Sequence, residues 1–154
     1  MNTTALIRPK QKKNYLKLHK TCKCGNPATT VDHIIPCHIF SVMCTFEMDY
    51  RNAVRDMENW QPMCKACNTN KSSTFDISEI PSSLYMKYKD IIDDYIKIRH
   101  KLYIKSGGKC KRCSKSVDET ECVIYLKDQN YIASVDNGYL VCPDCLQTGK
   151  GSKK

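Results

Sequence analysis

The chain has 154 residues, which is enough for one ordinary domain or two small ones, and only three Phe and one Trp are available to fill a core. Its formal net charge of +9 comes from the ends: residues 1–20 carry six Lys or Arg, residues 146–154 carry three, and neither range has an acid. Residues 1–20 lack the apolar stretch of a signal peptide, and no apolar run approaches the ~18 residues of a membrane span. We therefore expect no membrane partner and a reducing intracellular location in the cytoplasm, the nucleus or a virion.

The basic N-terminal segment, residues 1–20, is predicted to contain a short helix that begins at Pro9 and runs to Leu18, because Pro is favoured in the first turn of a helix. Basic ends around a neutral body suit contact with a phosphate backbone, and the alternative is a pair of solvated tails. The candidate phosphate contacts in this helix are Lys12, Lys13 and Lys17.

Residues 21–75 are predicted to form a first small α+β domain. A strand is expected at 29–31, with Pro36 ending the extended segment, and a helix is expected after Cys64. The apolar-rich insertion at 38–55 has no pattern that fixes its structure.

Residues 82–106 are predicted to form one long amphipathic helix that connects two halves of the chain. Ser82 or Ser83 is expected to cap its start, and Gly107-Gly108 its end. A further set of apolar residues widens the stripe, which favours packing against the chain's own domains over a dimeric coiled coil. A partner protein or second copy on the 84–102 face remains an alternative. The seam consists of apolar residues at alternating intervals of four and three: Leu84, Tyr88, Ile91, Tyr95, Ile98 and Leu102.

Residues 107–146 resemble a zinc ribbon, because two Cys-x-x-Cys pairs flank a stretch with short alternating segments. Strands are predicted at 121–126, 131–135 and 139–141, with Asp136-Asn137-Gly138 as a hairpin turn. A basic tail, residues 147–154, follows. A ribbon of this kind points to binding of DNA, RNA or protein.

Eight of the eleven cysteines fall into four close pairs, which predicts two structural Zn²⁺ sites with four thiolates each. In the first site the spacer between Cys22 and Cys24 is one residue shorter than usual, so Cys37 or His19 could substitute as a ligand. Filling both sites would lower the formal charge from +9 to +5. The isolated Cys37, Cys44 and Cys122 are interpreted as small buried apolar residues. The predicted ligands are Cys22, Cys24, Cys64 and Cys67 for the first site and Cys110, Cys113, Cys142 and Cys145 for the second.

A second pattern is interleaved with the first four cysteines. Val31-Asp32-His33-Ile34-Ile35-Pro36 precedes Asn59-Trp60-Gln61-Pro62-Met63-Cys64-Lys65-Ala66-Cys67-Asn68-Thr69-Asn70-Lys71, and Asn59 and Asn68 are nine positions apart. Over roughly residues 15–73 this arrangement resembles the zinc-stabilised HNH endonucleases, in which an Asp-His pair, a middle Asn and a last His or Asn form the motif. The resemblance implies a ββα-metal fold, joined here by the long helix to the zinc ribbon.

The resemblance also implies roles for these residues. His33 would be the general base of DNA phosphodiester hydrolysis, and Asn59 would hold it in position through backbone hydrogen bonds. Asp32 and Asn68 would hold one catalytic Mg²⁺ or Mn²⁺, and Lys71 would meet a phosphate. The expected products are a 5′-phosphate and a 3′-hydroxyl. Because neighbours in a regular strand point to opposite faces, Asp32 and His33 converge on one site only if the strand ends there.

Other interpretations stay open. Asp32 and His33 could form a purely structural pair, and Asn68 could merely cap a turn. A nucleobase deaminase is rejected, because neither His33 nor His38 begins a His-x-Glu element. The main alternative is a non-catalytic nucleic-acid-binding or assembly protein, such as a transcription-complex or virion component, that keeps these folds without cleaving. The abundance of Lys, Ile, Tyr and Asn hints at an AT-rich genome such as that of a virus or mobile element.

Overall fold

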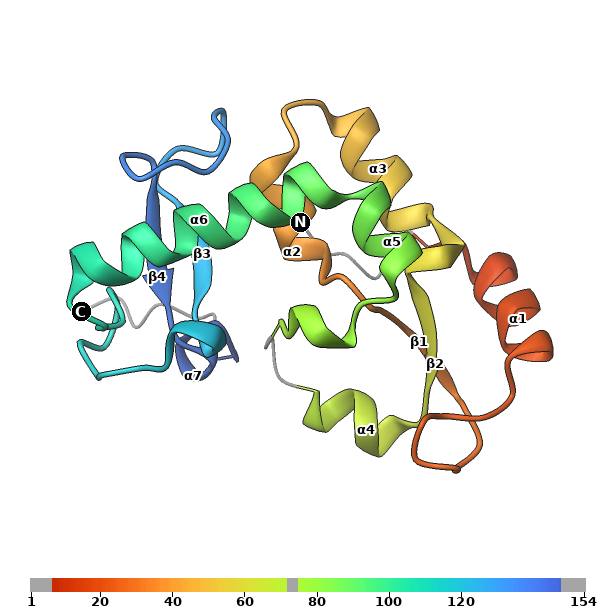
Figure 1. The fold of residues 1–154 in the computed structure, drawn as a ribbon. Coiled ribbons are helices and arrows are strands. Elements are labelled where there is room, and N and C mark those ends of the chain that lie inside the picture. Colours follow the sequence, from red (N-terminus) through yellow and green to blue (C-terminus); the bar gives the residue numbers. More distant parts are fainter. Residues whose placement is uncertain (1–6, 72–74, 148–154) are drawn as a thin grey trace.

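The computed structural model describes residues 7–71 and 75–147, and within them the chain is a small α+β protein with two separate two-stranded sheets (Figure 1). The expected tail at 147–154 lies outside the described residues except for Gln147. None of the described helices is long and apolar enough to cross a membrane. The helices are α1 Pro9–Leu18, α2 Cys37–Met43, α3 Glu47–Arg55, α4 Lys65–Asn70, α5 Ser82–Lys87, α6 Lys89–Ser106 and α7 Pro143–Gln147. The strands are β1 Thr30–His33, β2 Trp60–Met63, β3 Val123–Leu126 and β4 Gly138–Val141.

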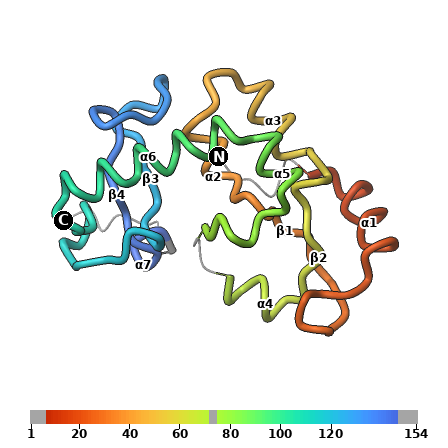
Figure 2. The backbone as a smooth tube through the Cα atoms, viewed as in Figure 1, coloured from red at the N-terminus to blue at the C-terminus, as the bar shows by residue number. Residues whose placement is uncertain are grey.

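Helix α6 runs along β3 and β4, and its N-terminal end points toward the half of the chain that contains β1, β2, α1 and α4 (Figures 1 and 2). The main core follows this helix. Buried side chains from α2, α3, α5, α6, β3 and β4 form one continuous hydrophobic cluster that reaches from Ile35 to Leu140. The expected packing of the amphipathic helix against its own chain is therefore observed.

The first sheet pairs β1 with β2 in antiparallel register, with Asp32 opposite Gln61 and His33 opposite Trp60. The expected strand is present but runs two residues further, through His33. Helix α1 starts with Pro9, as predicted, and its Tyr15 hydroxyl donates a 2.8 Å hydrogen bond to the Trp60 carbonyl. The predicted helix after Cys64 is α4, so the order in this half is strand, strand, helix.

The long helix predicted over 82–106 is divided at Tyr88, whose backbone (φ −117°, ψ 19°) separates α5 from α6. Tyr88 is held at this point by a 2.7 Å hydrogen bond from its hydroxyl to Asp56 and by edge-to-face packing on Phe40. The N-cap is Pro81 with no side-chain cap, which corrects the expectation for Ser82 or Ser83. The predicted glycine stop is confirmed, because Gly107 adopts the left-handed conformation at φ +62°.

The second sheet pairs β3 with β4, and the strand expected at 131–135 is absent from this described segment. A loop takes its place because Asn137 binds the backbone instead: its amide donates to the carbonyls of Tyr131 and Ile132. Gly138 follows at the start of β4. A Cβ there would lie 2.8 Å from both the Leu102 side chain and the Ser134 carbonyl, so only glycine fits.

Candidate functional site

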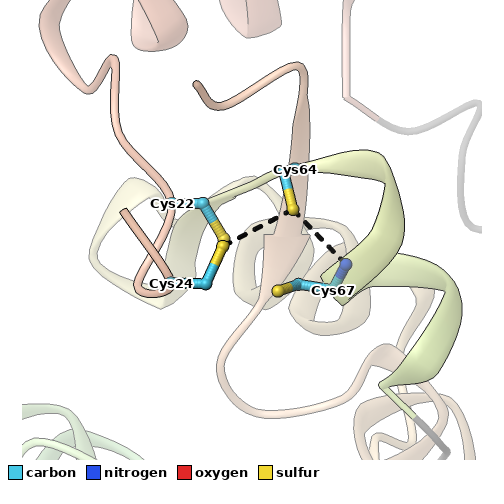
Figure 3. Close-up of side chains that lie close together, drawn as sticks. All are labelled: Cys22, Cys24, Cys64 and Cys67. Carbon is cyan, nitrogen blue, oxygen red and sulfur yellow. Dashed lines mark hydrogen bonds between the residues drawn. The ribbon is translucent and has the colours of Figure 1, made fainter. Parts of the chain in front are cut away.

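The first four-cysteine cluster joins the turn before β1 to the start of α4 (Figure 3). The sulfur atoms of Cys22, Cys24, Cys64 and Cys67 all lie within 4.8 Å of one another, and those of Cys24 and Cys64 are 3.7 Å apart. Gly25 closes the turn in the left-handed region at φ +88°, which accommodates the short Cys22-x-Cys24 spacer. Neither proposed substitute is needed, because Cys37 is in the main core and His19 stacks on Tyr15.

The backbone around this cluster favours thiolates. Hydrogen bonds from the backbone at Cys24 and Cys64 lower the pKa of the Cys22 thiol to about 6. The Cys67 amide also points at the Cys64 sulfur over 3.4 Å. Hydrogen bonds with the neighbouring thiols, that of Cys24 first, act in the opposite direction on Cys67 and raise its pKa to about 12. Because metals bind the thiolate form, the backbone donors prepare Cys22 and Cys64 for a cation.

The second cluster repeats this chemistry just beyond the C-terminal end of α6. The sulfur atoms of Cys110, Cys113, Cys142 and Cys145 also lie within 4.8 Å of one another, and Cys113 and Cys142 are 3.7 Å apart. Burial opposes ionisation of Cys110, but backbone hydrogen bonds, with Cys142 first among them, outweigh it and lower its pKa to about 6. Ser114 closes this turn at φ 60°, the position that Gly25 occupies in the first cluster.

Both clusters fit a tetrahedral ion. Four thiolates at about 2.3 Å from Zn²⁺ place neighbouring sulfur atoms about 3.8 Å apart, close to the 3.7 Å measured in each cluster. All eleven cysteines are free thiols. The clusters could therefore hold two structural metal ions such as zinc, and four protein ligands leave no position for a reacting water.

Three cysteines outside the clusters behave as core residues. Cys37 and Cys122 are buried in the main hydrophobic cluster, and Cys44 is partly buried against it. Burial raises the pKa of Cys37 to about 12 and that of Cys122 to about 11, so both stay protonated and unreactive at neutral pH. The interpretation of the single cysteines as small buried apolar residues is confirmed for Cys37 and Cys122, whereas Cys44 is only partly buried.

His33 is the buried histidine at the end of β1. Its Nε2 lies 2.9 Å from the Val54 carbonyl oxygen, which can only accept, so Nε2 carries the proton and Nδ1 keeps a lone pair. The Trp60 indole N–H donates to the same oxygen over 3.0 Å. Burial lowers the pKa of His33, while the hydrogen bond to Val54 and the charge of Asp32 act in the opposite direction. The ring is therefore neutral at pH 7, with a free basic nitrogen.

Val54 is a residue of the site that sequence reasoning missed. It lies in the last turn of α3, where helix carbonyls have no partner within the helix. The insertion at 38–55, which had no predicted structure, forms α2 and α3 and delivers this carbonyl to His33. No sequence signal could identify it, because every residue has a carbonyl group.

Asn59 is fully buried in the turn before β2 and joins the two strands. Its side-chain oxygen accepts from the Ile35 amide at 2.7 Å, and its side-chain nitrogen donates to the Ile35 carbonyl at 3.1 Å. Its own carbonyl accepts from the Ile34 amide at 2.8 Å. These bonds fix the chain just after His33.

Asp32 precedes His33 in β1, and the strand ends at His33, which is the condition for the two side chains to face one site. The two side chains nevertheless have different partners. The Lys71 ammonium lies 2.5 Å from Asp32 Oδ2 and 2.6 Å from the His33 carbonyl, so it neutralises this carboxylate. The expected contact of Lys71 with a phosphate stays a prediction, and it would compete with this ion pair. Asn68 lies on α4, which packs against β1, and its side chain has no hydrogen bond with the described residues.

The predicted phosphate-binding lysines of α1 lie at the end of the molecule opposite the second cluster (Figure 1). Lys13 and Lys17 are exposed and Lys12 is half-buried, and none of the three has an ion pair within the described residues. Their ammonium groups are available to an external anion.

Comparison of the chain with protein-family models, with curated proteins and with solved structures gives no match. What the chain does must therefore be inferred from the chemistry of its residues. Two arrangements carry that inference: the thiolate clusters, and the site formed by His33, Asp32 and Lys71.

Proposed function

We propose that this protein is a metal-dependent endonuclease of the HNH type that hydrolyses DNA phosphodiester bonds. The observation that carries the proposal is the buried, neutral His33, whose Nε2 is fixed on the Val54 carbonyl and whose Nδ1 is left without a hydrogen-bond partner in the described residues. An unprotonated ring nitrogen without a protein partner is what a general base requires. The order β1, β2, α4 and the four thiols around it are consistent with a zinc-stabilised ββα-metal scaffold.

In this proposal His33 Nδ1 takes a proton from the water that attacks phosphorus, and the bond from phosphorus to the 3′ oxygen breaks. Asn59 keeps the loop after His33 rigid, so that the ring does not turn away. Asp32 and Asn68 would hold a divalent cation, which supplies charge neutralisation at the phosphate and the departing oxygen when it is bound. The donor set fits an ion that takes one or two carboxylates and retains water, as Mg²⁺ does, and Asp32 already binds a cation in the form of Lys71.

The test replaces His33 by Gln, whose amide can still donate to the Val54 carbonyl but has no basic nitrogen. Loss of a general base should reduce cleavage by about 10² to 10⁴-fold, while zinc content, thermal unfolding and DNA affinity stay close to those of the unmodified protein. Plasmid, branched and single-stranded DNA should be assayed with Mg²⁺ and with Mn²⁺. Free imidazole should partly restore cleavage to His33→Gly, which a structural role would not allow.

The competing function is a nucleic-acid-binding or assembly protein that does not cleave. It would replace the nuclease if the unmodified protein leaves every DNA form intact with both metals, and if His33→Gln changes only stability. Retained cleavage by His33→Gln would remove His33 from the mechanism.

A further inference from the structure

A basic hollow lies beside the second cysteine cluster. The elements that bound it, the end of α6 and β4, lie at the far end of the chain from α1 (Figure 2). It has a volume of about 380 Å³ and is bounded by the last turn of α6, the turn that contains Cys110 and the β3–β4 hairpin. No carboxylate is among the residues that line it. Four lysines from these separate segments line it, and we call them the lysine hollow: Lys105, Lys109, Lys111 and Lys127.

Three of the four ammonium groups have no carboxylate partner within the described residues. Lys109 and Lys111 are exposed, and their side chains have no hydrogen bond or ion pair there. Lys127 donates to the backbone carbonyl of Asp136 at 2.5 Å, and Lys105 donates to that of Val135 at 3.3 Å. The only carboxylate paired with this group in the described residues is that of Asp136, which is fully exposed and 3.9 Å from Lys105. Such a weak exposed pair leaves the hollow positive, because four ammonium groups also outweigh the charge of −2 on a zinc-filled cysteine cluster beside it.

One aromatic ring lines the hollow, and a second ring and a further cation lie next to it. Tyr139 lines the hollow and lies opposite Tyr125 across the sheet, with ring centroids 5.9 Å apart. The Arg112 guanidinium lies 4.6 Å from the centre of the Tyr125 ring and donates to the Cys145 carbonyl at 3.0 Å. Positive charge beside aromatic faces is the combination that binds nucleic-acid strands.

We propose that the lysine hollow, with Tyr139 at its edge, binds the phosphodiester backbone of a nucleic acid as a contact separate from α1. The ligand class rests on the proposed function, but the binding itself requires no cleavage. Several cations spread over three chain segments suit a repeating anion better than a single phosphate. Because α1 and the hollow lie at opposite ends of the molecule, one strand must cross its full length, or two strands must be held at once.

The experiment measures affinity for a duplex and for a single strand of equal length, in zinc-containing buffer without Mg²⁺, over a series of salt concentrations. In Lys109→Ala/Lys111→Ala the slope of log K against log salt should fall by about 1.8 on the duplex or about 1.4 on the single strand, at about 0.9 or 0.7 per lost phosphate contact. The form with the higher affinity identifies the ligand. The control Lys97→Ala/Lys101→Ala removes the same charge from exposed positions of α6 and should leave the slope unchanged.

Two further measurements separate DNA binding from support of the metal cluster. Lys109→Arg/Lys111→Arg should keep the slope of the unmodified protein, and the alanine variant should keep its zinc. An unchanged slope in the alanine variant overturns the inference, and so does a reduced slope accompanied by loss of zinc, which would assign the lysines to neutralising the thiolates. Either result leaves the nuclease proposal intact. If the unmodified protein does not cleave DNA but its salt slope depends on Lys109 and Lys111, the nuclease proposal fails and the binding role of the lysine hollow stands.

Discussion

At the scale of single residues, the most consequential contact is that between Lys71 and Asp32. The ammonium occupies the carboxylate that the proposed mechanism needs as a metal ligand, and it also binds the His33 carbonyl. Both side chains are about three-quarters shielded, at 22% and 28% exposure, so the pair is more than a transient surface contact. Lys71 is therefore a competitor for any divalent cation at Asp32.

We predict that Lys71→Met strengthens the binding of Mn²⁺ to the zinc-loaded protein. A partly exposed ion pair contributes about 0.2 to 1 kcal/mol, so removing the ammonium should lower the dissociation constant by up to about fivefold. Electron paramagnetic resonance titration of free Mn²⁺ measures this without reference to cleavage. Lys65→Met, an exposed lysine of α4, is the matched control and should have no effect. Weaker Mn²⁺ binding in Lys71→Met would mean that the lysine organises the site instead of competing for it.

The sequence predicts a site residue where the residue type and its spacing themselves indicate the chemistry. The eight clustered cysteines could be predicted because thiol spacing is constrained by the turn that holds a metal. The partners of His33 and Asp32 could not. A backbone carbonyl from α3 and an ammonium 39 positions beyond Asp32 are brought in by tertiary packing, which local pattern does not encode.

At the scale of elements, apolar spacing identified the helical region but not its division. Leu84, Tyr95 and Leu102 of the predicted seam are buried, as is Ile92 from the wider stripe. The division comes at Tyr88, where Asp56 and Phe40 hold the side chain, and both are remote in sequence. The missing strand at 131–135 has a similar cause. Apolar and polar residues alternate over 131–135 as in a strand, but the Asn137 side-chain amide donates hydrogen bonds to the carbonyls of Tyr131 and Ile132.

The contact between α2 and α6 predicts a dependence of stability on pH. His38 of α2 is 3.2 Å from the Tyr95 hydroxyl of α6, and burial, with the nearby charge of Arg99, lowers its pKa to about 4. The unfolded chain takes up a proton near pH 6.5, whereas the folded chain does so only near the lowered value. His38 therefore costs the folded state stability as the pH falls from about 6.5 to about 4.

We expect His38→Gln to reduce this loss by about 1 kcal/mol between pH 7 and pH 5, below the ~2 kcal/mol of a fully enclosed ring, because His38 retains some exposed surface. Urea unfolding at pH 7 and pH 5 measures the difference between the two proteins and cancels the contribution of the thiolates. His100→Gln, which replaces an exposed histidine of α6, serves as the control. Equal pH dependence in His38→Gln and the unmodified protein would contradict the assignment.

At the scale of the whole molecule, the two cysteine clusters lie outside the main hydrophobic core. The core follows α6 and is shared by both halves of the chain. Cys22 and Cys64 of the first cluster are not part of this core, and neither are Tyr15 and Trp60 beside them. The second cluster has a small core of its own around Cys110, Val141 and Cys142, which shares Val117 with the main one. Metal and apolar burial therefore stabilise different regions.

We accordingly predict two Zn²⁺ per chain and unequal consequences when each is lost. Native mass spectrometry should count two ions in the unmodified protein and one in either Cys24→Ser/Cys67→Ser or Cys113→Ser/Cys145→Ser.

In the first variant, Cys24→Ser/Cys67→Ser, hydrogen exchange should become fast in α1, β1, β2 and α4, because metal binding and folding are coupled in a small module without its own core. Exchange in α6 should stay slow in that variant, since its contacts with α2 and β4 remain. In the second variant β4 should lose protection as well, and with it part of α6. Uniform loss of protection across the chain in both variants would show that the metals and the core form one cooperative unit.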